Sequence, residues 1–164
     1  MPSSDIVVVN TTPLLYLASI DQFELLRTFY QIVYLPEAVG NEILAGGSGS
    51  FGFGEFQKSG WIKTRAITNT AAKNYLLIEL DEGEAEVIVL AEELHANLII
   101  LDDNLARQIA RLRGFKITGT LGILMAAKQQ GLLPAVKPFL DRLRANGFWL
   151  NTDLYNRVLT QVGE

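Results

Sequence analysis

The chain has 164 residues, of which 49% are hydrophobic and 20% are charged, a composition typical of one globular domain with its own core. It contains no cysteine, which excludes a disulfide framework, a thiolate metal site and a thiol nucleophile, and which suits a reducing cytosol. The formal net charge of -4 argues against the uniformly basic surface of a protein that coats duplex nucleic acid.

The hydrophobic and charge pattern of the sequence predicts neither a membrane-spanning helix nor an export signal. The first five residues carry no basic segment, and the apolar run after them covers only residues 6–9. No later apolar run approaches the roughly 20 residues that a membrane-spanning helix needs. We therefore expect a single domain, residues 1–164, located in the cytoplasm.

The first half of the chain alternates short apolar runs with helical patterns. Residues 6–9 form a β-branched run that predicts a buried strand, and the sequence NTTP at 10–13 supplies a cap and a helix-starting proline. Helical patterns follow at 14–19 and 21–29, a second strand is predicted at 32–35, and Pro36 opens a helix that Gly46 ends. Residues 46–54 hold five glycines and predict a flexible loop, before an edge strand at 61–64 and a helix at 71–80.

The second half contains the clearest structural unit. A helix at 81–96, a strand at 98–101, a helix at 102–113 and a strand at 115–118 alternate as in a βαβ unit, which implies parallel pairing through right-handed crossovers. From residue 121 onward the pattern is helical, with interruptions at Pro134, Pro138 and Gly147 and a last helix at 152–162. We predict an α/β fold with a mostly parallel central sheet and helices on both faces.

Polar side chains gather where the predicted strands end, which is where open α/β sheets bind ligands. The candidates are Asn10, Glu42, Glu84, Asp102, Asp103, Thr118 and Thr120. A helix from residue 84 to 95 descends about 18 Å and the next strand climbs most of that distance, so Glu84 and Asp102 are predicted at the same rim. Clustered carboxylates repel one another and favour a bound cation, and hard oxygen ligands select Mg²⁺ or Mn²⁺.

Each candidate also has a purely structural interpretation. Asp81 and Glu84 match a capping box at a helix start, and one of Asp102 and Asp103 can cap the helix after its strand. Glu42 can be a solvated acid on its helix, Thr118 the end of a strand, and Thr120 a helix N-cap.

Basic and aromatic residues offer further contacts. Arg107 and Arg111 lie four apart on one predicted helix face, where they form either a local basic patch beside the acids or an ordinary solvated helix. Four aromatic residues near the glycine-rich loop can stack on bases, although core packing or a dimer contact is favoured for them: Phe51, Phe53, Phe56 and Trp61.

Five segments together resemble the PIN-domain nucleases. They are VVVNTTPL at 7–14, LPEAVGNEI at 35–43, LDEGEAE at 80–86, LIILDD at 98–103 and TGTLG at 118–122. The most similar branch is a prokaryotic group related to the toxins of toxin-antitoxin pairs. The resemblance implies a three-layer αβα fold and hydrolysis of RNA phosphodiesters, usually single-stranded, with Mg²⁺ or Mn²⁺. It also implies a homodimer held by an antitoxin protein.

The resemblance assigns roles residue by residue. It implies Glu42, Glu84 and Asp102 as the catalytic acids that hold the metal, with Asp103 and Asn10 as further ligands. Expected substrate contacts are Thr11, Thr118, Thr120, Arg107 and Arg111.

Asn10 departs from the family pattern, because the family places an aspartate there. An amide offers a neutral oxygen to a hard cation, but it removes one negative charge and cannot act as a base. Two hypotheses follow: a metal-dependent ribonuclease, and a catalytically weakened nucleic-acid-binding or protein-interaction module.

Overall fold

A five-stranded parallel sheet forms the centre of the computed structural model, which describes residues 5–164. Its strands are β1 (Val7–Val9), β2 (Val33–Pro36), β3 (Ile62–Arg65), β4 (Leu98–Ile100) and β5 (Lys116–Thr118), in the order β3-β2-β1-β4-β5. Every neighbouring pair is parallel, so the predicted mostly parallel sheet is confirmed and is wholly parallel over the described residues. The predicted edge position of the strand near residue 62 is also confirmed, because β3 ends the sheet.

β1 and β4 are covered on both faces of the sheet, which explains their continuous apolar sequences. All three valines of β1 are fully buried, as are Ile99 and Ile100 of β4. Val9 pairs with Ile100, and the next backbone N–H, that of Asn10, donates to the Ile100 carbonyl at 3.0 Å. The residues that follow β1 and β4 therefore begin side by side at the carboxyl edge of the sheet.

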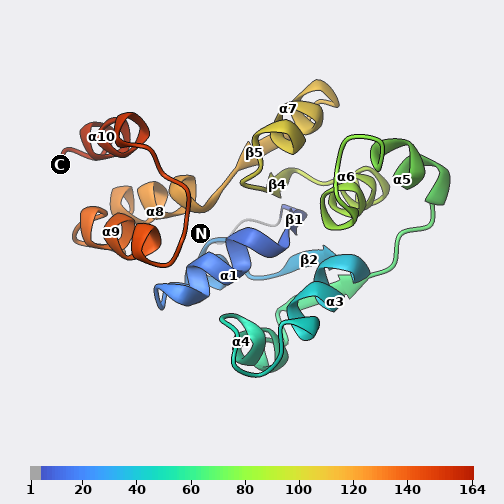
Figure 1. Ribbon diagram of the computed structural model, residues 1–164, viewed down its shortest axis with the longest axis horizontal. Helices are drawn as coiled ribbons and strands as arrows, with labels where there is room; N and C mark the ends of the chain where they lie inside the picture. The colour runs from blue at the N-terminus through green and yellow to red at the C-terminus, as the bar shows by residue number, and fades with distance from the viewer. Residues whose placement is uncertain (1–4) are drawn as a thin grey trace.

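Ten helices connect and cover these strands between residues 5 and 164. They are α1 (Thr11–Ser19), α2 (Glu24–Tyr30), α3 (Glu37–Ala45), α4 (Phe53–Lys58), α5 (Thr70–Leu76), α6 (Glu82–Leu94), α7 (Asn104–Leu112), α8 (Thr120–Gln129), α9 (Lys137–Ala145) and α10 (Thr152–Gln161). Figure 1 shows the strands between α8 and α9 on one side and α5 and α6 on the other, the three-layer α/β/α arrangement that we expected. None of the helices in the described part of the chain is long and apolar enough to cross a bilayer.

Several predicted boundaries shift by a few residues. The helix predicted at 71–80 ends at Leu76 and continues as turns, and the helix predicted at 102–113 begins only at Asn104. The glycine-rich segment 46–54 already contains the start of α4, whose N-cap Gly52 has a φ of +82°. The positive φ favours glycine here, and an added Cβ would lie 2.8 Å from Leu15 Cδ2, so the leucine side chain would have to shift. Pro138 does not interrupt a helix but lies in the first turn of α9, where proline is tolerated.

Candidate metal centre at the carboxyl edge of the sheet

Asn10 and Glu42 point into one corner beside the start of α6. Asn10 is 6% exposed and occupies the N-cap of α1, but its side chain makes no cap hydrogen bond. Glu42, on α3, accepts a hydrogen bond of 2.5 Å from the Thr11 hydroxyl to its Oε2. A Cβ on Gly83 would lie 2.9 Å from Glu42 Oε1 and 3.4 Å from Asn10 Oδ1. Two oxygens from separate elements therefore converge on the position in the first turn of α6 that lacks a side chain.

Glu84 forms the capping box predicted at the start of α6. The carboxylate of Asp81 accepts the Glu84 backbone N–H at 2.8 Å, and the Glu84 carboxylate accepts the Asp81 backbone N–H at 3.1 Å, which completes the capping box. Burial raises the pKa of Glu84, the Asp81 hydrogen bond lowers it, and the charges of Asp81, Asp103 and Glu42 raise it further, for a net increase. Glu84 thus lies near enough to Glu42 and Asp103 for their negative charges to repel its own, and a cation would relieve this repulsion.

Asp102 is held by the start of α8. Its Oδ1 accepts the Thr120 backbone N–H at 2.8 Å and its Oδ2 accepts the Thr120 hydroxyl at 2.6 Å. Burial raises the pKa of Asp102, while both Thr120 hydrogen bonds and the positive charge of Arg107 oppose that increase. A Cβ on Gly119 would lie 2.5 Å from Asp102 Oδ1 and 2.8 Å from Arg107 Nη1, so glycine is required between them.

Asp103, the neighbouring acid, has a structural role. Its side chain accepts the Ala106 backbone N–H at 2.9 Å as the N-cap of α7. The prediction that one of the two adjacent aspartates caps this helix is confirmed, and the cap is the second of them. Asp102 is left free of that task, because its hydrogen bonds run to Thr120.

The predicted substrate contacts separate into buried and exposed residues. Thr11 and Thr120 are buried, and their hydroxyls are committed to Glu42 and Asp102, so both act first as positioning residues. Arg107 is half-buried and donates to the Leu101 carbonyl at 2.8 Å, whereas Arg111 is exposed. Burial lowers the pKa of the Arg107 guanidinium, the charge of Arg111 lowers it further, and Asp102 opposes both. The two arginines therefore lie near each other, as their spacing predicted.

The donor set fits a hard divalent cation. Among residues 5–164, no three His, Cys, Asp or Glu side chains form a ready metal cluster. Mg²⁺, however, is commonly bound by only one or two carboxylates together with several waters. Glu42 Oε1 and Asn10 Oδ1 provide converging oxygens, and Glu84 adds negative charge beside them. The corner around Gly83 is thus the part of the rim best suited to an ion.

Sequence reasoning missed the two glycines that shape the rim, Gly83 and Gly119. A usable signal existed for Gly83, because glycine destabilises a helix and its presence inside one indicates a steric requirement. No comparable signal marked Gly119, since glycine is common in turns.

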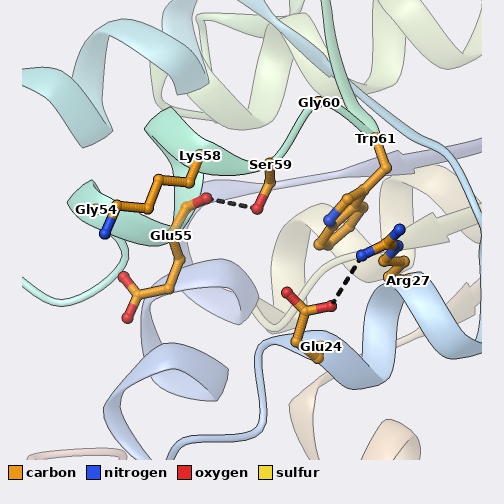
Figure 2. Close-up of a pocket in the computed structure, with 8 residues that line it drawn as sticks. All are labelled: Glu24, Arg27, Gly54, Glu55, Lys58, Ser59, Gly60 and Trp61. Carbon is orange, nitrogen blue, oxygen red and sulfur yellow. Dashed lines mark hydrogen bonds and ion pairs between the residues drawn. The ribbon is translucent and has the colours of Figure 1, made fainter.

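A separate pocket lies away from this rim, between α2, α4 and the start of β3. Figure 2 shows its residues, with Trp61 beside Arg27 and with Glu55 and Lys58 on α4. The cavity measures about 540 Å³. Its charged groups include the Glu24–Arg27 ion pair at 3.9 Å, and it contains none of the predicted site residues. We assign no function to it.

The fold and the rim together define a parallel α/β protein with acids at the carboxyl edge of its sheet. A family model described as a PIN domain matches residues 6–164, so the chain belongs to the PIN-domain family. The membership of the PIN-domain family that the sequence predicted is thereby confirmed. PIN domains generally use divalent metals. No curated protein matches the chain.

Proposed function

We propose that this protein is a metal-dependent endoribonuclease that hydrolyses phosphodiesters of single-stranded RNA. The observation that carries the proposal is the convergence of Glu42 Oε1 and Asn10 Oδ1 over Gly83, next to Glu84. These three side chains would hold Mg²⁺ or Mn²⁺. When bound there, the ion supplies positive charge to the phosphate oxygens and lowers the pKa of a water molecule.

The chain's own residues prepare this corner. The Thr11 hydroxyl fixes Oε2 of Glu42 and so directs Oε1 toward Gly83, which leaves the space open. On the other side, Thr120 fixes both oxygens of Asp102, yet each oxygen keeps a further lone pair that can orient a water or an ion.

Positive charge for the RNA backbone comes from α7. An anionic strand that crosses an acidic rim needs cationic contacts as well as the metal. Arg111 is exposed and Arg107 lies beside Asp102, so both can face a phosphate near the rim. Their contribution makes binding weaken as the salt concentration rises.

A cleavage assay on single-stranded RNA tests the proposal. We expect cleavage with Mn²⁺, none with EDTA, and a loss of at least about 100-fold in Glu42→Gln and Asp102→Asn, because each removes a charge from the metal site or its surroundings. The matched control is Glu37→Gln, an exposed acid in the first turn of the same helix as Glu42. Equal cleavage by the control and by both site variants would overturn the assignment, as would inactivity of the natural chain in Mn²⁺.

Asn10 favours a second candidate function, a non-catalytic RNA-binding or protein-binding module of the same fold. The amide lowers the negative charge of the corner by one, which weakens attraction for a cation. Titration with Mn²⁺ separates the two functions. If the natural chain binds no Mn²⁺ and Asn10→Asp does, the non-catalytic module is supported; if the natural chain binds Mn²⁺ and cleaves RNA, the module is excluded.

We further propose that the protein acts as the toxin of a toxin-antitoxin pair, in a homodimer bound by an antitoxin. Support comes from apolar side chains left exposed on α5, in the turns after it and on α7, with Tyr75 70%, Ile78 77% and Leu112 88% exposed. Light scattering of the purified chain measures its oligomeric state, and a monomer at all concentrations would contradict the homodimer. A small neighbouring reading frame whose product binds the chain would support the antitoxin.

A further inference from the structure

A second cavity adjoins Asp102 on the side of the C-terminal helices. It measures about 500 Å³ and lies between α7, the β5–α8 junction, α10 and the connection from α9 to α10. Figure 1 shows that connection running past α8 on its way to α10. Its lining includes the apolar side chains of Leu121, Met125, Leu154 and Val158. A volume of this size is typical of small-ligand sites, which measure roughly 300–1,000 Å³.

Trp149 stands at the edge of this cavity with an unusually open side chain. It is 75% exposed, although tryptophan is mostly buried in folded proteins. Its neighbours are anchored: Phe148 packs edge-on against Tyr16 with ring centroids 5.0 Å apart, and Leu150 is 7% exposed. The Leu150 carbonyl also accepts a hydrogen bond of 3.1 Å from the Arg144 side chain. The backbone around Trp149 is therefore fixed while its ring faces solvent.

Polar groups around the cavity can read the edge of a planar heterocycle. Asn104 and Gln161 each present an amide with both a donor and an acceptor, and the hydroxyl-bearing Thr118 lies in the same wall. Arg107 also lines the cavity, and one of its five N–H donors is committed to Leu101. Apolar side chains, an aromatic face, edge-reading amides and a guanidinium are the groups that proteins use to hold an unstacked base.

Asp102 connects this cavity with the acidic rim. It lines the cavity, and it comes shortly after β4, which pairs with β1, the strand that immediately precedes Asn10. A single strand whose phosphodiester lies at the rim can therefore place an adjoining base in the cavity.

We propose that this cavity is a nucleobase subsite for single-stranded RNA, in which one base stacks on Trp149. The subsite rests on the proposed function, because it assigns a place to a nucleotide next to the bond that is cleaved. Stacking on Trp149 tolerates every base, since all have an aromatic face, and any preference among bases comes from the amides of Asn104 and Gln161 at the base edge.

Tryptophan fluorescence tests the subsite directly. The chain has two tryptophans, and Trp61 packs against Phe23 with ring centroids 5.5 Å apart, so Trp61→Phe leaves Trp149 as the reporter. We would titrate this variant with an adenosine hexaribonucleotide in Ca²⁺, and check by gel electrophoresis that the oligomer stays intact. An abasic ribose-phosphate hexamer carries the same charge without a base. We expect the adenosine hexamer to quench the fluorescence and the abasic hexamer to leave it unchanged.

Three substitutions complete the experiment. Trp149→Leu should weaken binding of the adenosine hexamer about tenfold or more, because stacking on an aromatic ring is lost. Trp149→Phe should retain most of the affinity. The matched control is Tyr75→Leu, which removes another exposed aromatic ring, 70% exposed, outside the cavity. Its affinity should equal that of the natural chain.

The outcomes separate this inference from the proposed function. If the natural chain cleaves RNA and Trp149→Leu binds and cleaves equally well, the subsite is overturned and the nuclease stands. If the adenosine hexamer quenches Trp149 but no RNA is ever cleaved, the nuclease fails and the base-binding site stands. Equal binding of the adenosine and abasic hexamers, or no binding of either, overturns the subsite.

Discussion

Replacing Gly83 with alanine separates the stability of α6 from the geometry of the acidic corner. The new Cβ would lie 2.9 Å from Glu42 Oε1, closer than real Cβ contacts occur, so one of the two groups must move. Glu42 is an exposed, flexible side chain, whereas Gly83 is buried in the first turn of a helix. The carboxylate therefore moves, and its hydrogen bond of 2.5 Å from Thr11 is strained or lost.

Two opposing effects on stability nearly cancel. Alanine is favoured over glycine inside helices by up to about 1 kcal/mol. Loss of one hydrogen bond of this kind costs about 1 kcal/mol when water can replace the donor. We therefore expect the free energy of unfolding to change by less than about 1 kcal/mol, or roughly 2–4 °C in Tm for a chain of this size. Affinity for Mn²⁺ should fall about 10- to 100-fold, since a misplaced ligand weakens the site far more than the fold.

Thermal unfolding and calorimetric titration with Mn²⁺ measure the two quantities. Gly54→Ala is the matched control, because Gly54 is the second residue of α4 as Gly83 is of α6, and no atom lies within 4 Å of its added Cβ. The control should leave Mn²⁺ affinity unchanged. If Gly83→Ala binds Mn²⁺ as tightly as the natural chain does, the convergence of Glu42 and Asn10 on this position is refuted.

Three further predictions test other parts of the rim and the fold. Thr120→Val should lower the free energy of unfolding by about 1–3 kcal/mol in urea, because the Asp102 carboxylate loses a buried donor; an unchanged urea midpoint would contradict this role. Asn10→Asp should raise Mn²⁺ affinity about tenfold or more in calorimetry, and equal affinity would show that the amide of Asn10 does not weaken metal binding. Burial alone would raise the pKa of Glu164, but its hydrogen bonds with Lys128 and two backbone N–H groups lower it below the ordinary 4.5. Stability from this group is present above pH 4.5 and is lost as the pH falls through the lowered pKa, so Glu164→Gln should flatten the acid limb of a pH-stability profile.

The sequence predicted the layers of the fold because buried parallel strands are distinctive. The runs that became β1 and β4 are continuous and apolar, since helices cover both of their faces. Helix ends were harder to place. The helix predicted to start at Asp102 starts at Asn104, because two adjacent aspartates can each cap a helix and spacing alone does not distinguish them.

The candidate site was predictable in position but not in side-chain direction. Strand ends bring Asn10 and Asp102 to one edge in any parallel sheet of this order, so their proximity follows from the pattern. Asp102 turns toward Thr120 because of the backbone conformation at the β5–α8 junction. No periodic pattern of hydrophobic residues in the sequence predicts that conformation. Trp149 was missed for the same reason, since its exposure follows from the path of the chain after α9.

The acids at this rim lie where helices begin, and that position carries an electrostatic consequence. Asp81 caps α6, Asp103 caps α7, and Asp102 accepts the first backbone N–H of α8. Each helix start carries roughly half a positive charge, which stabilises a nearby carboxylate. The helix dipoles therefore supply part of the compensation that a bound cation would otherwise provide. We expect the chain to stay folded after EDTA treatment, with the acidic rim already assembled before an ion arrives.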